Sequence, residues 1–334
     1  MIYQEQSTPK PKGIGLVSGG LDSLLAVRVL QDQNLEVMGV TFFTPFFGPE
    51  QGLAGGKALA IPMRVLDISR PYLEMLKSPR YGYGSQANPC IDCHALMLRE
   101  AGRVMEEMGA RFLFTGEVLG QRPMSQRRDS LRSVENLSGF AGLVLRPLSA
   151  KLLPPTLVEL EGLVDRERLL DIQGRSRKRQ EALADRYGIV GYPQPAGGCI
   201  LTKEGFARKL TALFQSLPGA TPRQAELIRL GRFFRLPGGN VLLVGRNRLE
   251  NERLETAAAD EDGVFRVLDF PGPLGLLIGH GPLETDFQTA AQLVLAYSDA
   301  PDDHPVAVKW RHKGETGVFN WLKPQKELFA SCHV

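Results

Sequence analysis

One short run, residues 18–23 (Ser-Gly-Gly-Leu-Asp-Ser), constrains the fold of this chain more than any other feature. It follows a predicted strand at 13–17 and precedes a predicted helix at 22–33. A strand, a glycine-rich turn and a helix N-terminus in this order direct backbone N–H groups at an anion, and glycines let the backbone approach it closely. The run predicts an ATP site, whose candidate ligands are Ser18, Gly19, Gly20, Asp22 and Ser23.

The residues in and after this turn limit the reactions that it can support. No lysine follows the turn, which disfavours transfer of the γ-phosphate. Asp22 is the one carboxylate in the run, and Mg²⁺ prefers carboxylate and phosphate oxygens, so Asp22 is a candidate catalytic residue that holds Mg²⁺. On these six residues alone, a purely structural strand–turn–helix corner stays open as the alternative.

Up to about residue 200 the chain alternates between strand and helix patterns. Strands are predicted at 13–17, 35–43, 63–68, 111–115 and 143–146, and helices at 22–33, 90–109, 156–171 and 176–187. Such alternation indicates an α/β fold in which a parallel sheet has helices on both faces and its site at the carboxyl ends of the strands. The glycine-rich residues 46–60 are expected to form a mobile loop near that edge.

A break in periodicity at 193–198 (Pro-Gln-Pro-Ala-Gly-Gly) predicts the end of a first domain, 1–200. The second domain, 203–334, is expected to be a smaller α+β unit. Its helices are predicted at 204–216, 221–231 and 285–297, and its strands at 240–245, 264–269 and 306–311.

Composition limits the class of partner. The 334 residues carry a net charge of only +3, but twelve Lys or Arg oppose seven Asp or Glu between residues 120 and 180. A local excess of this kind suits a polyanion such as RNA. The chain shows no secretory signal and no apolar stretch long enough to span a membrane, so we expect a cytoplasmic protein without a membrane partner.

Four cysteines in a reducing compartment favour metal binding or catalysis over disulfides. Cys90 and Cys93 form a Cys-x-x-Cys pair at the start of a predicted helix, where the helix dipole favours thiolates. Cys199 follows two glycines that could return it to the sheet edge. Three cysteines with one vacancy suit an iron–sulfur cluster with an open iron, whereas His94 or Cys332 as a fourth ligand would suit zinc.

Three segments together resemble a known family. Residues 115–121 (Thr-Gly-Glu-Val-Leu-Gly-Gln), followed by Ser125 and Gln126, are similar to a run in the tRNA 4-thiouridine synthetases. Residues 146–148 (Arg-Pro-Leu) resemble the strand that follows it, and residues 88–93 (Asn-Pro-Cys-x-x-Cys) resemble 2-thiouridylases and cluster-dependent thiolases. The chain, over about residues 12–200, therefore resembles the tRNA thiolation enzymes of the pyrophosphatase-loop (PP-loop) family, whose members split ATP to AMP and pyrophosphate.

The resemblance implies an ATP-dependent tRNA sulfurtransferase that adenylates a uridine and exchanges its oxygen for sulfur, with 4-thiouridine at tRNA position 8 as the leading product. It also implies a [4Fe-4S] cluster on three cysteines, with Cys199 among the catalytic residues. The implied partners are tRNA and a sulfur donor (free sulfide, or a persulfide from an enzyme such as a cysteine desulfurase), and a homodimer is left open. The residues carrying these roles are Thr115 and Gly116 for the nucleoside, Gln121, Ser125 and Gln126 for the base, Cys90, Cys93 and Cys199 for the cluster, and Arg122, Arg127 and Arg128 for RNA phosphates.

Two departures from this family keep alternatives open. The loop starts at Ser18 without the N-terminal RNA-binding extension of the 4-thiouridine synthetases, and residues 203–334 do not resemble the rhodanese domain that some of them carry. One alternative is a metal-free enzyme in which Cys93 and Cys199 carry a persulfide and make 2-thiouridine. Others are a zinc-containing PP-loop ligase that does not act on RNA, and a non-catalytic protein that binds nucleotide and RNA.

Overall fold

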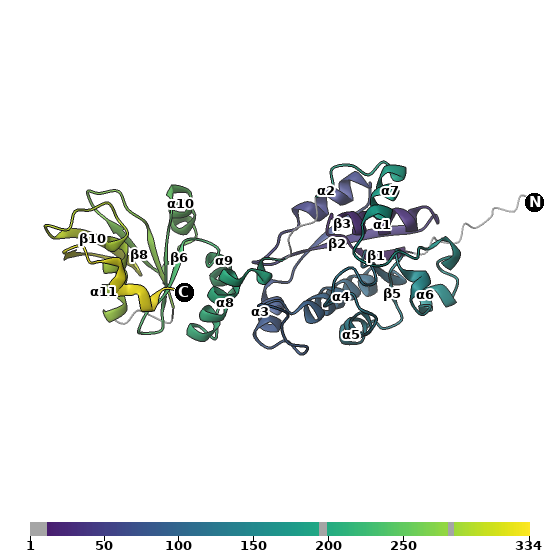
Figure 1. Ribbon diagram of the computed structural model, residues 1–334, viewed down its shortest axis with the longest axis horizontal. Helices are drawn as coiled ribbons and strands as arrows, with labels where there is room; N and C mark the ends of the chain where they lie inside the picture. The colour runs from purple at the N-terminus through teal and green to yellow at the C-terminus, as the bar shows by residue number, and fades with distance from the viewer. Residues whose placement is uncertain (1–11, 194–198, 280–283) are drawn as a thin grey trace, which may run out of the picture. The chain divides into compact units, whose positions relative to one another are not determined.

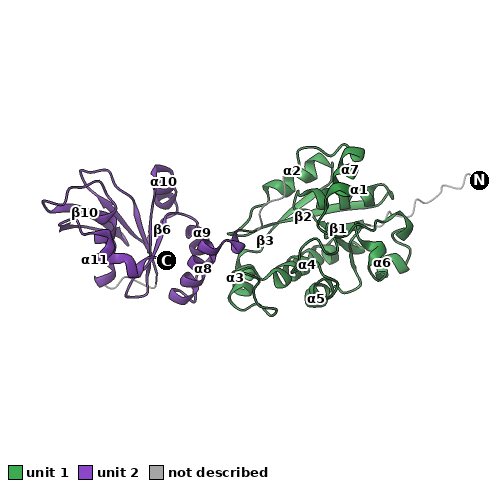
Figure 2. Ribbon diagram, in the orientation of Figure 1, with its two compact units in different colours: residues 1–199 green, residues 200–334 purple. Residues whose placement is uncertain are grey.

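The chain divides into two compact units, Met1–Cys199 and Ile200–Val334, which Figure 2 shows in different colours. The computed structural model describes residues 12–193, 199–279 and 284–334. Each unit has its own sheet and its own hydrophobic core.

The first unit is built on a five-stranded parallel sheet, as the alternation of strands and helices predicts. Its central strands are almost wholly buried, because helices cover both faces of the sheet and neither face is exposed to water. The strands are β1 (Lys12–Leu16), β2 (Glu36–Phe43), β3 (Met63–Asp67), β4 (Phe112–Thr115) and β5 (Val144–Leu145).

The order of these strands fixes where a ligand can bind. In the sheet they run β3-β2-β1-β4-β5, so the chain moves outward from β1 in one direction and from β4 in the other. The connections that follow β1 and β4 therefore run to opposite sides of the sheet. In such a sheet, the carboxyl ends of these two strands flank a crevice. The segments that follow β1 and β4 are the two that the sequence singles out.

Helices lie on both sides of this sheet (Figure 1). Helices α1 and α7 cover one side, while α4 and α5 cover the other. The apolar side of α1 is completely buried, for example at Leu25 and Leu30. The helices of the unit are α1 (Leu21–Gln31), α2 (Glu50–Ala58), α3 (Ser69–Lys77), α4 (Cys90–Glu107), α5 (Arg128–Ser138), α6 (Leu157–Leu160) and α7 (Lys178–Tyr187), with 3₁₀ turns η1 (Ala150–Leu152) and η2 (Arg166–Arg168).

Two expectations for this unit are wrong. Residues 46–60 are not a loop, because 50–58 form the helix α2. The predicted helix at 156–171 is only the short α6 and the turn η2. Gly162, with φ +70°, takes the left-handed conformation just after α6, and the Asp165 side chain accepts a hydrogen bond from Glu167 N that starts η2.

The second unit is built on a six-stranded antiparallel sheet of order β11-β10-β8-β9-β7-β6. Helix α11 packs against β8, β9 and β10, and its buried residues join the core of the unit. The strands are β6 (Arg232–Arg235), β7 (Val241–Val244), β8 (Gly263–Val267), β9 (Gly275–Ile278), β10 (Val306–His312) and β11 (Glu315–Trp321). The helices are α8 (Glu204–Ser216), α9 (Pro222–Leu227), α10 (Arg248–Thr256) and α11 (Glu284–Ala296), with the 3₁₀ turns η3 (Ile200–Thr202) and η4 (Lys326–Cys332).

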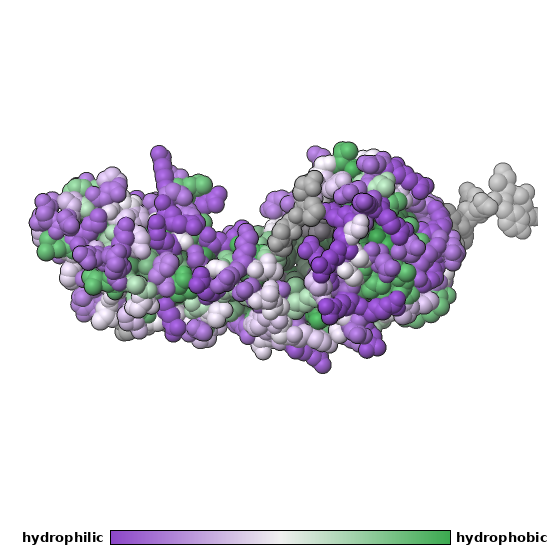
Figure 3. Space-filling view, viewed as in Figure 1, coloured by the Kyte–Doolittle hydropathy of each residue, from purple (hydrophilic) through white to green (hydrophobic). Residues whose placement is uncertain are grey.

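In the view of Figure 3, hydrophilic and apolar residues are interspersed on the described surface of each unit. In the described ranges, no helix combines the length and the hydropathy needed to cross a membrane.

Candidate functional site

The turn after β1 has the geometry of an anion cradle. Gly19 has φ +77°, a conformation that side chains other than glycine rarely adopt. Two serine hydroxyls hold the turn: Ser18 Oγ accepts from Gly20 N at 3.3 Å, and Ser23 Oγ donates to the Gly20 carbonyl at 2.8 Å. The turn is therefore fixed before any ligand arrives, and α1 begins directly behind it.

Helix α2 packs against this turn so closely that no side chain would fit between them. A Cβ on Gly19 would lie 2.1 Å from the carbonyl oxygen of Gln51 in α2. A Cβ on Gly52 would lie 2.5 Å from the Val17 carbonyl oxygen, so α2 is held close by its own glycines. The glycines of residues 46–60 thus serve close helix packing, and this explains why the expectation of a mobile loop fails.

The turn after β4 forms the opposite wall. A Cβ on Gly116 would lie 2.5 Å from both Asp22 C and Ser23 N, so this turn touches the backbone of the first one. Thr115 is buried and lies beside Leu16 in the register of β4 and β1. The two candidate segments, far apart in sequence, meet at the crevice between β1 and β4.

Asp22 is the central polar residue of this crevice. Its Oδ2 accepts a hydrogen bond from Gln121 Nε2 at 3.1 Å. Its Oδ1 is buried and, among the described residues, has no hydrogen-bond partner. Burial raises the pKa of Asp22, and the Gln121 hydrogen bond and the charge of Arg177 partly oppose that rise. An unpartnered carboxylate oxygen beside a phosphate cradle fits a Mg²⁺ ligand.

The segment that carries Gln121 is closed into a tight loop. Gly120 N donates to the Gln126 carbonyl at 2.7 Å, and the side-chain Oε1 of Gln126 accepts from Arg122 N at 3.0 Å. Ser125 and Gln126 are both buried in this loop. Of the three predicted base-binding residues, Gln121 reaches the crevice at Asp22, while Gln126 braces the loop.

The basic segment divides into exposed and internally paired residues. Arg122, Arg127 and Arg128, the predicted phosphate contacts, are all exposed. Others in the segment make ion pairs: Arg146 is buried between two glutamates, Arg166 pairs with Glu159, and Arg179 pairs with Asp171. Arg179 stays exposed despite its pair, so burial removes Arg146 from the exposed basic surface and reduces the share of Arg166.

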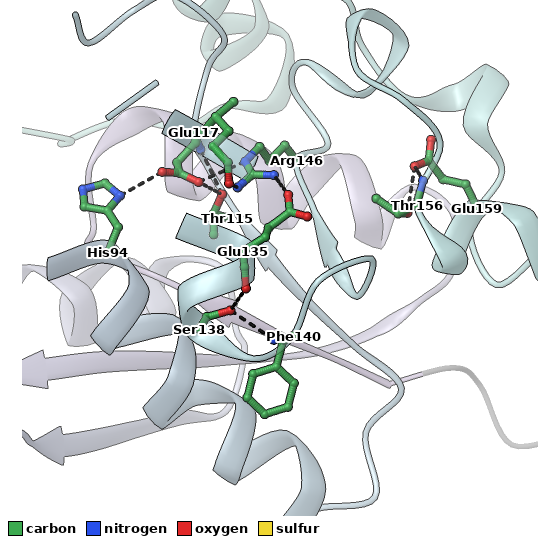
Figure 4. Close-up of polar contacts among 10 residues, drawn as sticks. His94, Thr115, Glu117, Glu135, Ser138, Phe140, Arg146, Thr156 and Glu159 are labelled. Carbon is green, nitrogen blue, oxygen red and sulfur yellow. Dashed lines mark hydrogen bonds and ion pairs between the residues drawn. The ribbon is translucent and has the colours of Figure 1, made fainter. Parts of the chain in front are cut away.

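Sequence reasoning missed a buried ion-pair network behind the second wall, shown in Figure 4 and called here the Glu117 network (His94, Thr115, Glu117, Glu135 and Arg146). Glu117 accepts hydrogen bonds from Arg146 Nε at 3.0 Å and from Thr115 Oγ1 at 3.1 Å, and pairs with His94 Nδ1 at 2.8 Å. Arg146 also pairs with Glu135. Although burial alone would raise it, the charge of Arg146 and the contact with His94 lower the pKa of Glu117 to about 2. Glu117 and Arg146 each follow the end of a strand, β4 and β5, and no further signal in the sequence indicates that they pair.

The cysteine pair lies at the start of α4, as expected. Cys93 Sγ lies 3.3 Å from the hydroxyl of Tyr72, a buried residue of α3 that sequence reasoning did not single out. Cys90 Sγ accepts from Asn88 Nδ2 at 3.4 Å. The charges of Cys90 and of the exposed Cys199 both act on Cys93, which places the three thiols within electrostatic range of one another.

The helix dipole is expected to favour the thiolate at both cysteines, but at Cys93 burial outweighs it. Burial raises the pKa of Cys93 to about 12, and the Tyr72 hydrogen bond opposes this only in part. Across the described part of the chain, no group of three or more His, Cys, Asp or Glu side chains is arranged to hold a metal ion. The three cysteines are suitable iron ligands by donor type, but their arrangement is not that of a formed metal site. Of the two residues left open as a fourth ligand, His94 contacts Glu117, and Cys332 packs against the core of the second unit.

Part of the second unit matches the model of a known protein family. Residues 231–326 match the model of the NFACT protein RNA binding domain. This stretch runs from the start of β6 to η4 and includes the whole antiparallel sheet. Sequence reasoning found no motif there.

Comparison with curated proteins finds relatives among enzymes that thiolate tRNA. The chain is 27% identical over 175 residues to the tRNA-specific 2-thiouridylase MnmA of Pelobacter propionicus, covering 48% of each chain. It is 27% identical over 164 residues to that of Trichlorobacter lovleyi, covering 45% of this chain and 46% of the relative. The chain thus spans about half the length of the curated relatives it matches. Among solved structures, a 4-thiouridine synthetase–RNA complex with bound ATP aligns at 21% identity and a TM-score of 0.34, over 62% of this chain and 51% of the other.

Proposed function

We propose that this protein is an ATP-dependent tRNA sulfurtransferase, which adenylates a uridine and replaces its oxygen with sulfur. The observation that carries the proposal is the unpartnered Oδ1 of Asp22, which is buried beside a preformed anion cradle. The sequence relation to tRNA thiouridylases supports the same chemistry.

In the first step, ATP would lie along residues 18–23 with its magnesium on Asp22 and its nucleoside against Thr115 and Gly116. The uridine carbonyl oxygen attacks the α-phosphorus, the bond to the β-phosphate oxygen breaks, and pyrophosphate leaves. Activation is required because a carbonyl oxygen is a poor leaving group, whereas AMP is a good one. Gln121, which contacts Asp22, would orient the base together with Ser125, and the uridine must leave its stack to enter.

In the second step, a sulfur nucleophile attacks the activated carbon and AMP leaves with the original oxygen. Cys90, Cys93 and Cys199 would hold that sulfur, since Cys90 and Cys199 both act electrostatically on Cys93, which lies in the first turn of α4. A [4Fe-4S] cluster on these three thiols would supply an open iron that binds sulfide. Tyr72 would then donate a hydrogen bond to the sulfur of Cys93.

RNA binding would involve both units. The match of residues 231–326 to an RNA-binding domain supports such a role for the second unit. In the first unit, the exposed Arg122, Arg127 and Arg128 border the loop that carries Gln121 and would contact backbone phosphates. The same match argues against a ligase that does not act on RNA.

Two products agree with this chemistry. We propose 4-thiouridine at tRNA position 8 as the leading product, because residues 115–121 resemble the corresponding run of the 4-thiouridine synthetases. The matched relatives are 2-thiouridylases, which favours 2-thiouridine as the second candidate. Both require the same activation step and differ in the uridine carbonyl that is attacked.

The test is to incubate the full chain with ATP, Mg²⁺, sulfide and unmodified tRNA, then digest the RNA and separate its nucleosides by mass spectrometry. We expect one thiouridine per tRNA, and its retention time distinguishes the 4-thio from the 2-thio isomer. Absence of any thionucleoside, with a known thiolase active in parallel, would overturn the proposal.

A second experiment separates the two sulfur routes. Iron, acid-labile sulfide and zinc are measured in protein purified without oxygen, and each cysteine is replaced by alanine. The cluster route predicts iron and sulfide in equal amounts and loss of activity in Cys90→Ala as well as in Cys93→Ala and Cys199→Ala. A metal-free protein in which Cys90→Ala stays active would establish the persulfide route, and one zinc per chain would favour the ligase.

A further inference from the structure

The start of α7 lies beside Asp22, although nothing in the proposed reaction uses it. Arg177 directly precedes α7 and Gln180 lies in its first turn. Helix α7 packs on α1, which carries Asp22 in its own first turn. The guanidinium of Arg177 and the amide of Gln180 both oppose the rise in the pKa of the Asp22 carboxyl, which places Arg177 within electrostatic range of Asp22 and Gln180 next to it, although no hydrogen bond of normal geometry joins Gln180 to Asp22.

Several buried polar atoms at this place lack partners. Gln180 is 0% exposed. Neither Nε2 nor Oε1 of Gln180 makes a hydrogen bond within the described residues, and the same holds for Arg177 Nε and Asp22 Oδ1. Leaving a buried polar group unpaired costs on the order of 1–3 kcal/mol, so such atoms need an explanation. We call Asp22, Gln121, Arg177 and Gln180 the Asp22 cluster.

The backbone holds the cluster in place. Gly174 N, three residues before Arg177, donates to the Leu119 carbonyl at 2.8 Å. Ser149 Oγ accepts from Leu119 N at 2.9 Å and donates to the Ile172 carbonyl at 2.6 Å. The segment that leads into α7 and the segment that leads to Gln121 are therefore tied together, and both reach Asp22 from this shared support.

Charge identifies the ligand that would complete the cluster. Two guanidinium groups, Arg177 and Arg122, act on the single carboxylate of Asp22. The first turn of α7 adds backbone N–H groups that attract anions. An anion that brings its own divalent cation satisfies all of these groups, since the cation takes Asp22 and the anion takes the guanidinium. Magnesium-bound polyphosphate has this chemistry, and AMP alone does not.

We propose that Arg177 and Gln180 bind the β- and γ-phosphates of ATP and retain the pyrophosphate formed when AMP is transferred. This inference rests on the proposed function. Arg177 donates to phosphate oxygens, and the Gln180 amide supplies one donor and one acceptor to the phosphates and to the water shell of the magnesium. Arg179 takes no part, because it is exposed and paired with Asp171.

The first test measures binding of Mg-ATP, Mg-pyrophosphate and AMP to the full chain by titration calorimetry. Arg177→Gln should weaken Mg-ATP and Mg-pyrophosphate about 10- to 100-fold, the usual value of hydrogen bonds to charged groups, and leave AMP unchanged. Arg179→Gln is the matched control, because Arg179 lies two residues from Arg177 and is equally basic, and it should change none of the three. Unchanged pyrophosphate binding in Arg177→Gln, or an equal loss in the control, would overturn the proposal.

The second test uses stability, because a ligand-binding amide and a structural amide behave in opposite ways. Gln180→Leu keeps the volume and removes the unpaired polar atoms, so the Tm of the ligand-free protein should rise or stay equal. The increase in Tm caused by Mg-pyrophosphate should shrink at the same time. A fall in ligand-free Tm with an undiminished response to Mg-pyrophosphate would show a structural role and overturn the assignment of Gln180.

The wild-type protein separates this inference from the function on which it rests. Wild-type chain that binds neither Mg-ATP nor Mg-pyrophosphate would overturn both. Wild-type chain that binds both, with Arg177→Gln binding them equally well, would overturn only the role of α7.

Discussion

The first unit contains two buried polar clusters that differ in how completely their atoms are paired. In the Glu117 network, Glu117 pairs with His94, Thr115 and Arg146, and Arg146 also pairs with Glu135. In the Asp22 cluster, buried atoms of Asp22, Arg177 and Gln180 have no partner within the described residues. Both clusters lie next to the turn after β4, so their difference does not come from distance to the sheet edge.

This difference in pairing indicates that the Glu117 network supports the structure, whereas the Asp22 cluster binds a ligand. A buried network whose groups are paired rigidifies the elements that it joins. Here it fixes Thr115, and with it the turn that packs on the backbone of Asp22 and Ser23. Unpaired atoms in the second cluster cost stability in the free protein and become useful only when a ligand binds. The comparison predicts that substitutions in the first cluster change stability and those in the second change activity.

The largest effect is expected for Asp22→Asn. It removes a proposed magnesium ligand and leaves the side-chain volume unchanged, so tRNA-dependent AMP formation should fall about 10³-fold, the scale on which lost transition-state electrostatics act. Its Tm should stay close to that of the wild-type protein. The measurement is AMP release with labelled ATP. An active Asp22→Asn enzyme would contradict the claim that substitutions in the Asp22 cluster reduce activity.

The opposite result is expected for Glu117→Gln. It leaves the buried guanidinium of Arg146 with one carboxylate instead of two, and breaking a buried pair costs about 3–5 kcal/mol. Urea unfolding of the purified variant measures this loss of unfolding free energy. A variant that unfolds like the wild-type protein would show that the Glu117 network does not support the fold.

Acid titration tests whether the charge of Glu117 stabilises the fold. The pKa of Glu117 is about 2, below the ordinary value of 4.5, so its contribution to stability is complete above about pH 4.5 and is lost as the pH falls toward 2. The gap in unfolding free energy between the wild-type protein and Glu117→Gln should therefore narrow over that range. Glu107→Gln, which removes an exposed partner of Arg64, is the control and should show little gap at any pH. A Glu117→Gln gap that stays constant down to pH 2 would contradict the assignment.

A smaller effect is expected where the two turns touch. Gly116→Ala places a methyl group 2.5 Å from the backbone of Asp22 and Ser23, which must move apart. We expect a loss of about 1–3 kcal/mol in stability, typical of overpacking, with weaker ATP binding. Gly205→Ala, with nothing within 4 Å of its new Cβ, should instead be neutral or slightly stabilising. Equal behaviour of the two variants would show that the contact does not shape the site.

The smallest effect is expected on the surface. Arg64 and Glu107 form an exposed ion pair at 2.9 Å, with side chains 37% and 58% exposed. Arg64→Ala should change the unfolding free energy by less than about 1 kcal/mol, because water screens such pairs. Urea unfolding at low and high salt checks this, and a loss as large as that of Glu117→Gln would remove the contrast between buried and exposed pairs.

Much of the fold and part of the site can be predicted from the sequence. The parallel sheet follows from the alternation of strands and helices, and residues 18–23 form the turn after β1 and the first residues of α1, as expected. The prediction of a mobile loop at 46–60 from its glycine content is wrong, because glycine is typical both of flexible turns and of closely packed helices. The contacts of Gly52, Gly55 and Gly56 with neighbouring elements distinguish the two.

The rest depends on contacts between distant segments. Arg146 and Glu117 meet because β4 and β5 are neighbours, and no local pattern records that pairing. Arg177 and Arg179 belong to one basic run, yet Arg177 acts on Asp22 while Arg179 pairs with Asp171. Arg177 precedes α7 and Arg179 lies in its first turn, and the residue that reaches Asp22 becomes evident only once α7 is placed on α1.

The most direct test of the account is the fate of ATP in the presence and absence of tRNA. With ATP labelled on the α- and γ-phosphates, the account predicts AMP and pyrophosphate in equal amounts, formed only when tRNA is present and matched by thionucleoside when sulfide is added. Release of ADP and phosphate, or formation of AMP at the same rate without tRNA, would contradict it.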